Sequence, residues 1–164
     1  MRRVIGIDPG LEDTGWAVIE TDDANRIILK GFGLIKTSSK DALSKRLKKI
    51  YDGVVGKIKE FDVDAASIEE VYFMDKIKTQ SLTTHSRGVI LLAFENSGVK
   101  YSEYNPRVVK NMITGNGNAK KSQIQSAVRM MFSIKEDLYP DVADAIAIAL
   151  TELRLFKLKE KKIL

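Results

Sequence analysis

The sequence predicts an α/β fold, because strand patterns and helix patterns alternate along its 164 residues. The chain opens with a largely β-branched apolar run, residues 4–7, which leads into Asp8 and stops at Pro9-Gly10. Two more strand patterns follow after short connections, and the hydrophobic period then lengthens to that of a helix. A hydrophobic content of 44% with 30% charged residues is typical of a globular chain. We therefore expect residues 1–164 to form one domain with a buried core.

Composition excludes several classes of function. The chain has no cysteine, which excludes disulfides, zinc sites built on thiolates and a cysteine nucleophile. It has no apolar run of about eighteen residues, so we expect no membrane span, and the start Met1-Arg2-Arg3 does not resemble a signal peptide. These features predict a cytoplasmic protein. The 27 basic residues exceed the 22 acidic ones, which hints at a polyanionic partner.

The opening strand places a carboxylate at its tip. Its β-branched residues suit a buried strand, and Pro9-Gly10 must end it, because proline cannot donate to a ladder. Ligands collect at the carboxyl ends of strands in open α/β sheets, so Asp8 is a candidate site residue. The alternative is that Asp8 only hydrogen-bonds the turn that follows it.

The first half of the chain then reads as a meander and a helix. Residues 15–20 and 27–37 predict two strands that extend the first one as an antiparallel meander. Residues 43–61 carry one apolar stripe at helical spacing, with Ser39 or Asp41 as the expected cap. The lysines and arginines on its other face indicate a solvated surface or a contact with phosphates.

A fourth strand is expected at residues 65–72, where Glu69 interrupts an apolar run. A charge inside a buried strand is costly unless it is paired or bound to a metal. Alternation lets only one of Glu69 and Glu70 point the same way as Asp8, and the other reading is that one of them simply faces solvent. Residues 87–96 predict an apolar helix that is either buried or half of a subunit interface.

A fifth strand at residues 99–104 and a helix that starts at Pro106 lead to a glycine-rich segment, residues 115–122. This segment is not a P-loop, because Lys120 stands where a glycine is needed and the segment follows a helix. It predicts a turn, followed by Lys120 and Lys121 at a helix N-terminus. Ammonium groups and backbone N–H groups there favour an anion such as a nucleic-acid phosphate.

A late helix supplies two more acids. Asp141 resembles an N-cap, and Asp144 lies three residues on, so both carboxylates share one face of the helix. Acidic residues are common caps, and that alternative stands for this segment alone.

Taken together, the candidate acids predict a metal site. Asp8, Glu69 and the Asp141/Asp144 pair are remote in sequence, yet each borders the expected core. Converging carboxylates repel one another unless cations lie between them, and oxygen-only ligation selects Mg²⁺ or Mn²⁺. A pair of such ions about 4 Å apart can drive phosphodiester hydrolysis. With Lys121 to neutralise charge on the scissile phosphate, the residues outline a nuclease site.

Several motifs, in order over nearly the whole chain, resemble those of the bacterial crossover-junction (Holliday-junction) endonuclease family of the RuvC type. They are Gly6-Ile7-Asp8-Pro9-Gly10 with Thr14-Gly15, Ile68-Glu69-Glu70-Val71, Ser86-Arg87-Gly88, Lys110 with Gly115-Asn116-Gly117 and Lys121-Ser122, and Asp141-Val142-Ala143-Asp144-Ala145. The resemblance implies a ribonuclease-H-like fold with a five-stranded mixed sheet flanked by helices. It further implies a homodimer that nicks two strands of a four-way DNA junction symmetrically with divalent metal ions, and that cooperates with a branch-migration motor.

The resemblance also implies roles for single residues. The metal-binding catalytic acids are Asp8, Glu69, Asp141 and Asp144. Lys121 stabilises the phosphate, and the expected DNA-binding residues are Tyr72, Lys76, Lys110, Lys120 and Lys121. Arg87-Gly88 opens the helix that pairs subunits in the family.

Two positions depart from the family pattern. Lys76 stands where asparagine is usual, and His85 stands where glutamine is common. Both fall in the region expected to approach DNA, so the departures bear on sequence preference and leave the acids untouched.

Three other functions share some of these features. Sugar kinases and actin-like ATPases also open with a strand, an acid and a glycine turn, but they need two domains around the nucleotide, and this chain is too short. A related nuclease acting on RNA or on another DNA structure would share the same motifs. A non-catalytic junction binder has no use for four carboxylates that would repel DNA.

Overall fold

The fold is built on one five-stranded sheet with the strand order β3-β2-β1-β4-β5. The structure is a computed structural model that describes residues 2–24, 26–70 and 77–160, with the side chains of 77–82 excepted. The strands are β1 (Arg2–Asp8), β2 (Asp13–Thr21), β3 (Ile27–Lys36), β4 (Ala65–Glu69) and β5 (Lys100–Tyr104). β1, β2 and β3 form the antiparallel meander, whereas β4 and β5 run parallel to β1. The predicted α/β fold with a five-stranded mixed sheet is confirmed.

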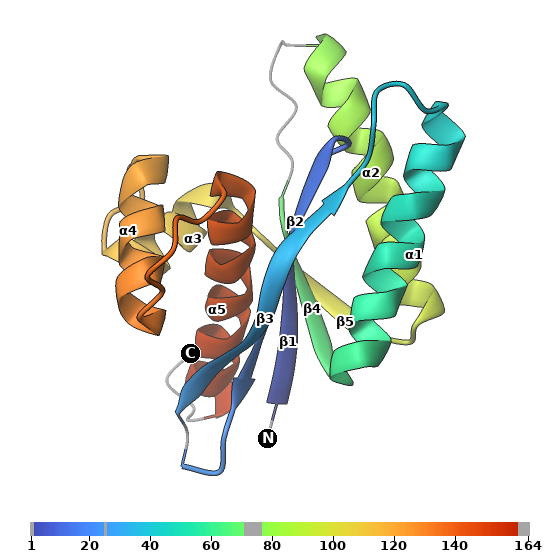
Figure 1. Ribbon diagram of the computed structural model, residues 1–164. Helices are drawn as coiled ribbons and strands as arrows, with labels where there is room; N and C mark the ends of the chain where they lie inside the picture. The colour runs from blue at the N-terminus through green and yellow to red at the C-terminus, as the bar shows by residue number, and fades with distance from the viewer. Residues whose placement is uncertain (1, 25, 71–76, 161–164) are drawn as a thin grey trace.

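Helices cover both faces of this sheet (Figure 1). α1 (Leu43–Phe61) and α2 (Ile77–Asn96) lie on one face, and α5 (Pro140–Glu160) lies on the other. α3 (Pro106–Thr114) and α4 (Lys121–Phe132) pack against α5. The buried apolar side chains accordingly form two clusters, one on each side of the sheet. No helix in the described part of the chain is long and apolar enough to cross a bilayer.

α5 lies unusually close to the sheet, and this closeness sets the position of its N-terminus. A methyl group at Gly6 of β1 would lie 2.2 Å from the carbonyl oxygen of Ala145, and one at Gly15 of β2 would lie 2.1 Å from that of Asp141. Only glycine fits at such distances. The buried hydroxyl of Ser67 on β4 donates to another carbonyl of α5. Three strands thus hold the helix, and its first turn lies over the carboxyl end of β1.

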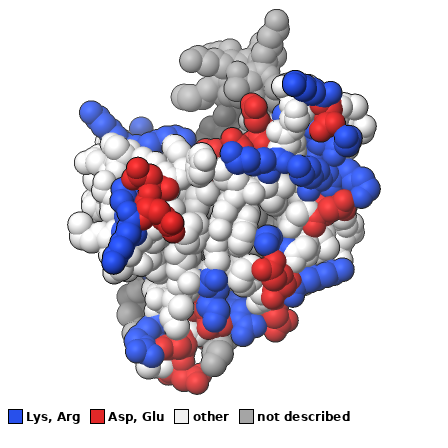
Figure 2. All heavy atoms as spheres, viewed as in Figure 1, with Lys and Arg blue, Asp and Glu red and all other residues white. Residues whose placement is uncertain are grey.

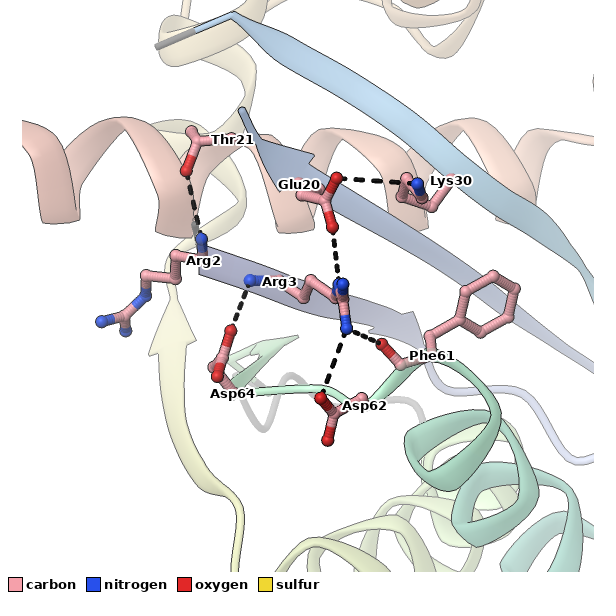
Figure 3. Close-up of polar contacts among 8 residues, drawn as sticks. All are labelled: Arg2, Arg3, Glu20, Thr21, Lys30, Phe61, Asp62 and Asp64. Atoms are coloured by element: carbon pink, nitrogen blue, oxygen red, sulfur yellow. Dashed lines mark hydrogen bonds and ion pairs between the residues drawn. The ribbon is translucent and has the colours of Figure 1, made fainter. Parts of the chain in front are cut away.

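The opposite end of the sheet is held by an arginine network (Figure 3). Arg3 of β1 contacts the carboxylate of Glu20 at 2.5 Å, and Glu20 also lies 3.6 Å from Lys30. The other partners of Arg3 are the Phe61 carbonyl at 3.3 Å, the Asp62 carboxylate at 3.3 Å and, through its backbone N–H, the Asp64 carboxylate at 2.7 Å. The hydrogen bond from Arg3 lowers the pKa of Glu20 below its ordinary value, although burial opposes it. Each carboxylate in this network therefore contacts a group that stabilises its charged form.

Two predicted helix caps are wrong. The N-cap of α1 is Ala42, without a side-chain hydrogen bond, and neither Ser39 nor Asp41 takes that position. Asp41 instead pairs with Lys45, one turn along, at 2.7 Å. α5 begins at Pro140, so Asp141 lies inside its first turn. Proline suits this first position, because a first-turn N–H has no partner within the helix.

Two predicted boundaries also differ. α2 begins at Ile77, ten residues before the predicted start at Arg87. The added turns are mostly polar and carry no apolar stripe that would signal a helix. The fourth strand ends at Glu69, and the rest of its predicted range beyond residue 70 lies outside the described residues.

Candidate active site

Two adjoining parallel strands end in carboxylates. Ile7 of β1 pairs with Ile68 of β4, so Asp8 and Glu69, the next residue on each strand, end the strands side by side. The two isoleucines are buried in the cluster under α1 and α2. Because side chains alternate along a strand, Asp8 and Glu69 point to the other face, which α5 covers. Glu69, and not Glu70, therefore shares the side of Asp8.

α5 adds two more carboxylates at the same place. Asp8 pairs with Gly15 of β2, and the backbone of Asp141 lies directly against Gly15. Asp141 and Asp144 are half-buried, whereas every other residue from Val142 to Leu153 is buried. Their spacing of three residues puts both on one side of the helix. The glycine contact thus brings this pair to the end of β1.

Electrostatics shows that these acids interact. Burial raises the pKa of Asp8 well above its ordinary value, and the carboxylates of Asp144, Glu69 and Asp141 raise it further. The pKa of Glu69 is also raised, first by burial and then by Asp144. Burial likewise raises the pKa of Asp144. Four acids that are remote in sequence therefore form one cluster with strong mutual repulsion.

Two lysines face the cluster. The ammonium of Lys121, in the first turn of α4, lies 3.3 Å from the Asp144 carboxylate, and its side chain is 68% exposed. Burial alone would lower the pKa of Lys121, but Asp144, Asp8 and Asp141 outweigh burial and raise it. The positive charge of Lys110 on α3 acts to lower the pKa values of Glu69 and Asp144, whereas burial raises them. The site thus has a cation beside it that an incoming phosphate can contact.

The donor set fits a hard divalent cation. Its ligating atoms are carboxylate oxygens, which Mg²⁺ and Mn²⁺ prefer, and a positive ion among them would relieve the repulsion. Within the described ranges, no three Asp, Glu or His side chains already meet in an arrangement that could coordinate one ion. Asp144 is turned to Lys121 instead. An ion held by these carboxylates would therefore compete with Lys121 for Asp144.

The remaining predicted residues divide into two groups. Lys120 directly precedes α4 and is exposed, as expected for a lysine at that helix N-terminus. His85 lies on α2 and is exposed. Tyr72 and Lys76 lie outside the described residues, so their predicted contacts with DNA stay predictions.

The structure shows what two residues of the sequence motifs, Thr14 and Arg87, contact beside the site. The hydroxyl of Thr14 donates to the Gly10 carbonyl at 2.6 Å and closes the turn after β1. The guanidinium of Arg87 donates to the Glu69 carbonyl at 2.6 Å. The sequence signal for Arg87 was the Ser86-Arg87-Gly88 motif, and only packing reveals what its side chain contacts.

A mixed sheet of this order, with acids at the ends of β1 and β4 and on the facing helix, defines the class of ribonuclease-H-like nucleases. The model of the family "Crossover junction endodeoxyribonuclease RuvC" matches residues 4–152. The chain belongs to this family, and the resemblance inferred from its motifs is confirmed.

Individual proteins agree with this assignment. A crossover junction endodeoxyribonuclease RuvC of Rhodopirellula baltica is 42% identical over 149 residues, which cover 90% of this chain and 83% of that protein. One from Ehrlichia ruminantium is 37% identical over 157 residues, covering 94% of this chain and 98% of that one. The structure of T. thermophilus RuvC in complex with a Holliday junction substrate has a TM-score of 0.88 and 29% identity, with 97% of each chain covered.

Proposed function

We propose that this chain is a structure-selective endonuclease that resolves four-way (Holliday) DNA junctions by symmetric hydrolysis of two strands, during recombination and repair. The observation that carries the proposal is the convergence of Asp8, Glu69, Asp141 and Asp144 where α5 meets β1, in a chain of the RuvC family. In this proposal, residues 1–164 act as one nuclease domain, and the protein acts on DNA in the cytoplasm.

The four acids are the metal ligands in this proposal. Asp8, Glu69, Asp141 and Asp144 would hold a pair of Mg²⁺ ions, or Mn²⁺, which supply a nucleophilic water and stabilise the leaving oxygen. Lys121 moves from Asp144 toward the scissile phosphate and neutralises the charge that builds on it. Lys110 adds a second positive charge to the same side of the site.

DNA reaches this site across a basic border. Lys110, Lys120 and Lys121 line it on the side of α3 and α4, and Tyr72 and Lys76 follow the end of β4 in the chain. Figure 2 shows further lysine and arginine side chains along α1. Tyr72 would stack on a base, an interaction worth about 1–3 kcal/mol. The net charge of +5 favours such a polyanion.

A second copy of the chain completes the active unit. Two subunits related by a twofold axis can meet equivalent strands of a junction that itself has near-twofold symmetry. α2 is the pairing element, and it exposes Leu92, which is 52% accessible. A branch-migration motor complex is the further partner that would deliver the junction.

The test is a cleavage assay on a synthetic four-way junction and a linear duplex of the same sequence, each with Mg²⁺ and with a chelator. We expect paired nicks in the junction only, and only with Mg²⁺. Equal cutting of the linear duplex would show a nuclease without structure selectivity. Binding of the junction without any cutting, under all metal conditions, would favour a non-catalytic binder.

A further inference from the structure

Arg87 connects α2 to β4 and β5 at the edge of the active site. Its Nη1 atom donates to the carbonyl oxygen of Glu69 at the end of β4, at 2.6 Å. Its Nη2 atom lies 2.6 Å from the carboxylate of Glu103 on β5. The Arg87 side chain is only 12% exposed, whereas that of Glu103 is 38% exposed. A charge-assisted contact in which one guanidinium binds two partners is stronger and more specific in geometry than a single ion pair.

The end of β4 needs such a support. β4 has five residues, and its pairing with β1 runs only to Ile7 and Ile68. β1 continues into Pro9, and proline has no N–H with which to extend the ladder. On the other side, the N–H of Glu70 donates to the Tyr104 carbonyl of β5. The Arg87 guanidinium thus supplies a donor to the Glu69 carbonyl where the ladder with β1 stops.

We propose that Arg87 is a positioning residue that fixes the end of β4 and so holds the Glu69 carboxylate in the active site. The inference rests on the proposed function, because it concerns how the proposed ligand set is held. The carboxylate of Glu69 is attached to the same residue as the carbonyl that Arg87 binds, so release of the carbonyl frees the ligand to shift. Loss of groups that orient metal ligands lowers metal affinity or activity by about 10–100-fold.

The chain offers a matched control at the far end of the sheet. Arg3 also binds one glutamate, Glu20 at 2.5 Å, and one backbone carbonyl, that of Phe61 at 3.3 Å. Arg3→Ala therefore removes a comparable contact from the same sheet without touching the acid cluster. Arg87→Lys keeps the charge but cannot donate to both partners in the same planar geometry.

The experiment measures single-turnover cleavage of a four-way junction against Mg²⁺ concentration, junction affinity without divalent ions, and the melting temperature Tm. For Arg87→Ala we expect a rate or an Mg²⁺ midpoint that is worse by about 10–100-fold, with junction affinity little changed. Arg87→Lys should recover part of this loss. Arg3→Ala should lower the Tm while the rate and the Mg²⁺ midpoint stay at the wild-type values.

The other possible results overturn either the role of Arg87 or the proposed function. If the wild-type protein cuts the junction and Arg87→Ala has the same rate and the same Mg²⁺ midpoint as the wild type, the role of Arg87 is overturned and the proposed function stands. Failure of the wild type to cut junctions would overturn the proposed function itself. If Arg87→Ala does not fold, Glu103→Gln decides: a raised Mg²⁺ midpoint supports the role of Arg87, and an unchanged one overturns it.

Discussion

At the end of the sheet where β1 begins, the carboxylates of Glu20, Asp62 and Asp64 all contact Arg3. At the opposite end, the carboxyl end of β1, Asp8 faces three further carboxylates. Among the described residues, Lys121 is the cation that the structure pairs with this second group, and its side chain is mostly exposed. The pKa of Glu20 is lowered by its arginine, and the pKa of Asp8 is raised by burial and by its neighbours. The carboxylate group is thus stabilised as an anion at one end and destabilised as an anion at the other.

This difference separates a structural role from a functional one. Ion pairs at the amino end join β1, β2, β3 and the segment after α1, so they support the fold. Repulsion at the carboxyl end costs stability, and a fold retains such a cost where the charges do chemical work.

The largest expected effect comes from removing one charge at each end. Asp8→Asn removes a proposed metal ligand, and we expect junction cleavage to fall by about 10³-fold or more with junction binding largely kept. Glu20→Gln removes a carboxylate of the arginine network, and we expect cleavage to stay near the wild-type rate at a temperature where the variant is folded. Parallel cleavage and binding assays check both. Loss of binding as severe as the loss of cutting in Asp8→Asn would contradict the assignment of Asp8.

The next effect separates the two neighbouring lysines at the start of α4. Lys121 contacts Asp144, so Lys121→Ala should lower the single-turnover rate by about 10²-fold, with a smaller loss of affinity. Lys120→Ala should weaken junction binding and its salt dependence and leave the rate from the bound state nearly unchanged. A loss of affinity alone in Lys121→Ala would make Lys121 a positioning contact with DNA and not a catalytic group.

A third prediction tests the approach of α5 to the sheet. A methyl group at Gly15 would lie 2.1 Å from the Asp141 carbonyl, so Gly15→Ala must push the start of α5 away from Asp8. A shift of about 1 Å in a catalytic group can cost about 100-fold in rate, and we expect a loss of that order together with a lower Tm.

Gly56 on α1 provides the control for Gly15. A methyl group there meets nothing within 4 Å, so Gly56→Ala should raise stability by about 0.5–1 kcal/mol without changing cleavage. Normal cleavage by Gly15→Ala would show that the close contact with α5 is not needed to assemble the site.

The smallest effect is the pH dependence of stability, measured as Tm without divalent ions. Asp8, Glu69 and Asp144 have raised pKa values, so their contribution to stability is fully present below about pH 4 and is lost as the pH rises through the folded-state values. Glu20 has a lowered pKa, so its contribution is complete above about pH 5 and is lost only on acidification.

The two variants should therefore change the pH curve differently. Asp8→Asn should flatten the fall in Tm above about pH 4, whereas Glu20→Gln should lower the curve above about pH 5 without changing its slope there. Curves of equal slope for the wild type and Asp8→Asn would contradict the raised pKa of Asp8. Addition of Mg²⁺ at pH 8 should raise the Tm of the wild type more than that of Asp8→Asn.

Much of this site follows from local sequence. The β-branched run before Pro9-Gly10 predicts a strand that ends at Asp8, and β1 does end there. The apolar stripe predicts the helix over residues 43–61, and its residues Ile50, Val54 and Ile58 are buried. Both patterns depend on neighbours within one element, so they are readable without knowledge of the fold.

Other features depend on contacts across the fold. The start of α2 at Ile77 lacks a local hydrophobic signal, and the cap of α1 belongs to Ala42. Arg87 reaches Glu69 across eighteen residues of sequence, and Lys121 reaches Asp144 from another helix. No periodicity within one element encodes such partners.

The sequence by itself determined the family to which the chain belongs, and it predicted the candidate acids and the strands and helix that carry them. Only the tertiary structure decided that Glu69 and not Glu70 faces Asp8, that Gly15 lets α5 approach β2 and that Arg87 supports the end of β4. The reason is physical: propensity and periodicity act between residues close in sequence, whereas register, close approach and ion pairing arise when remote elements pack together.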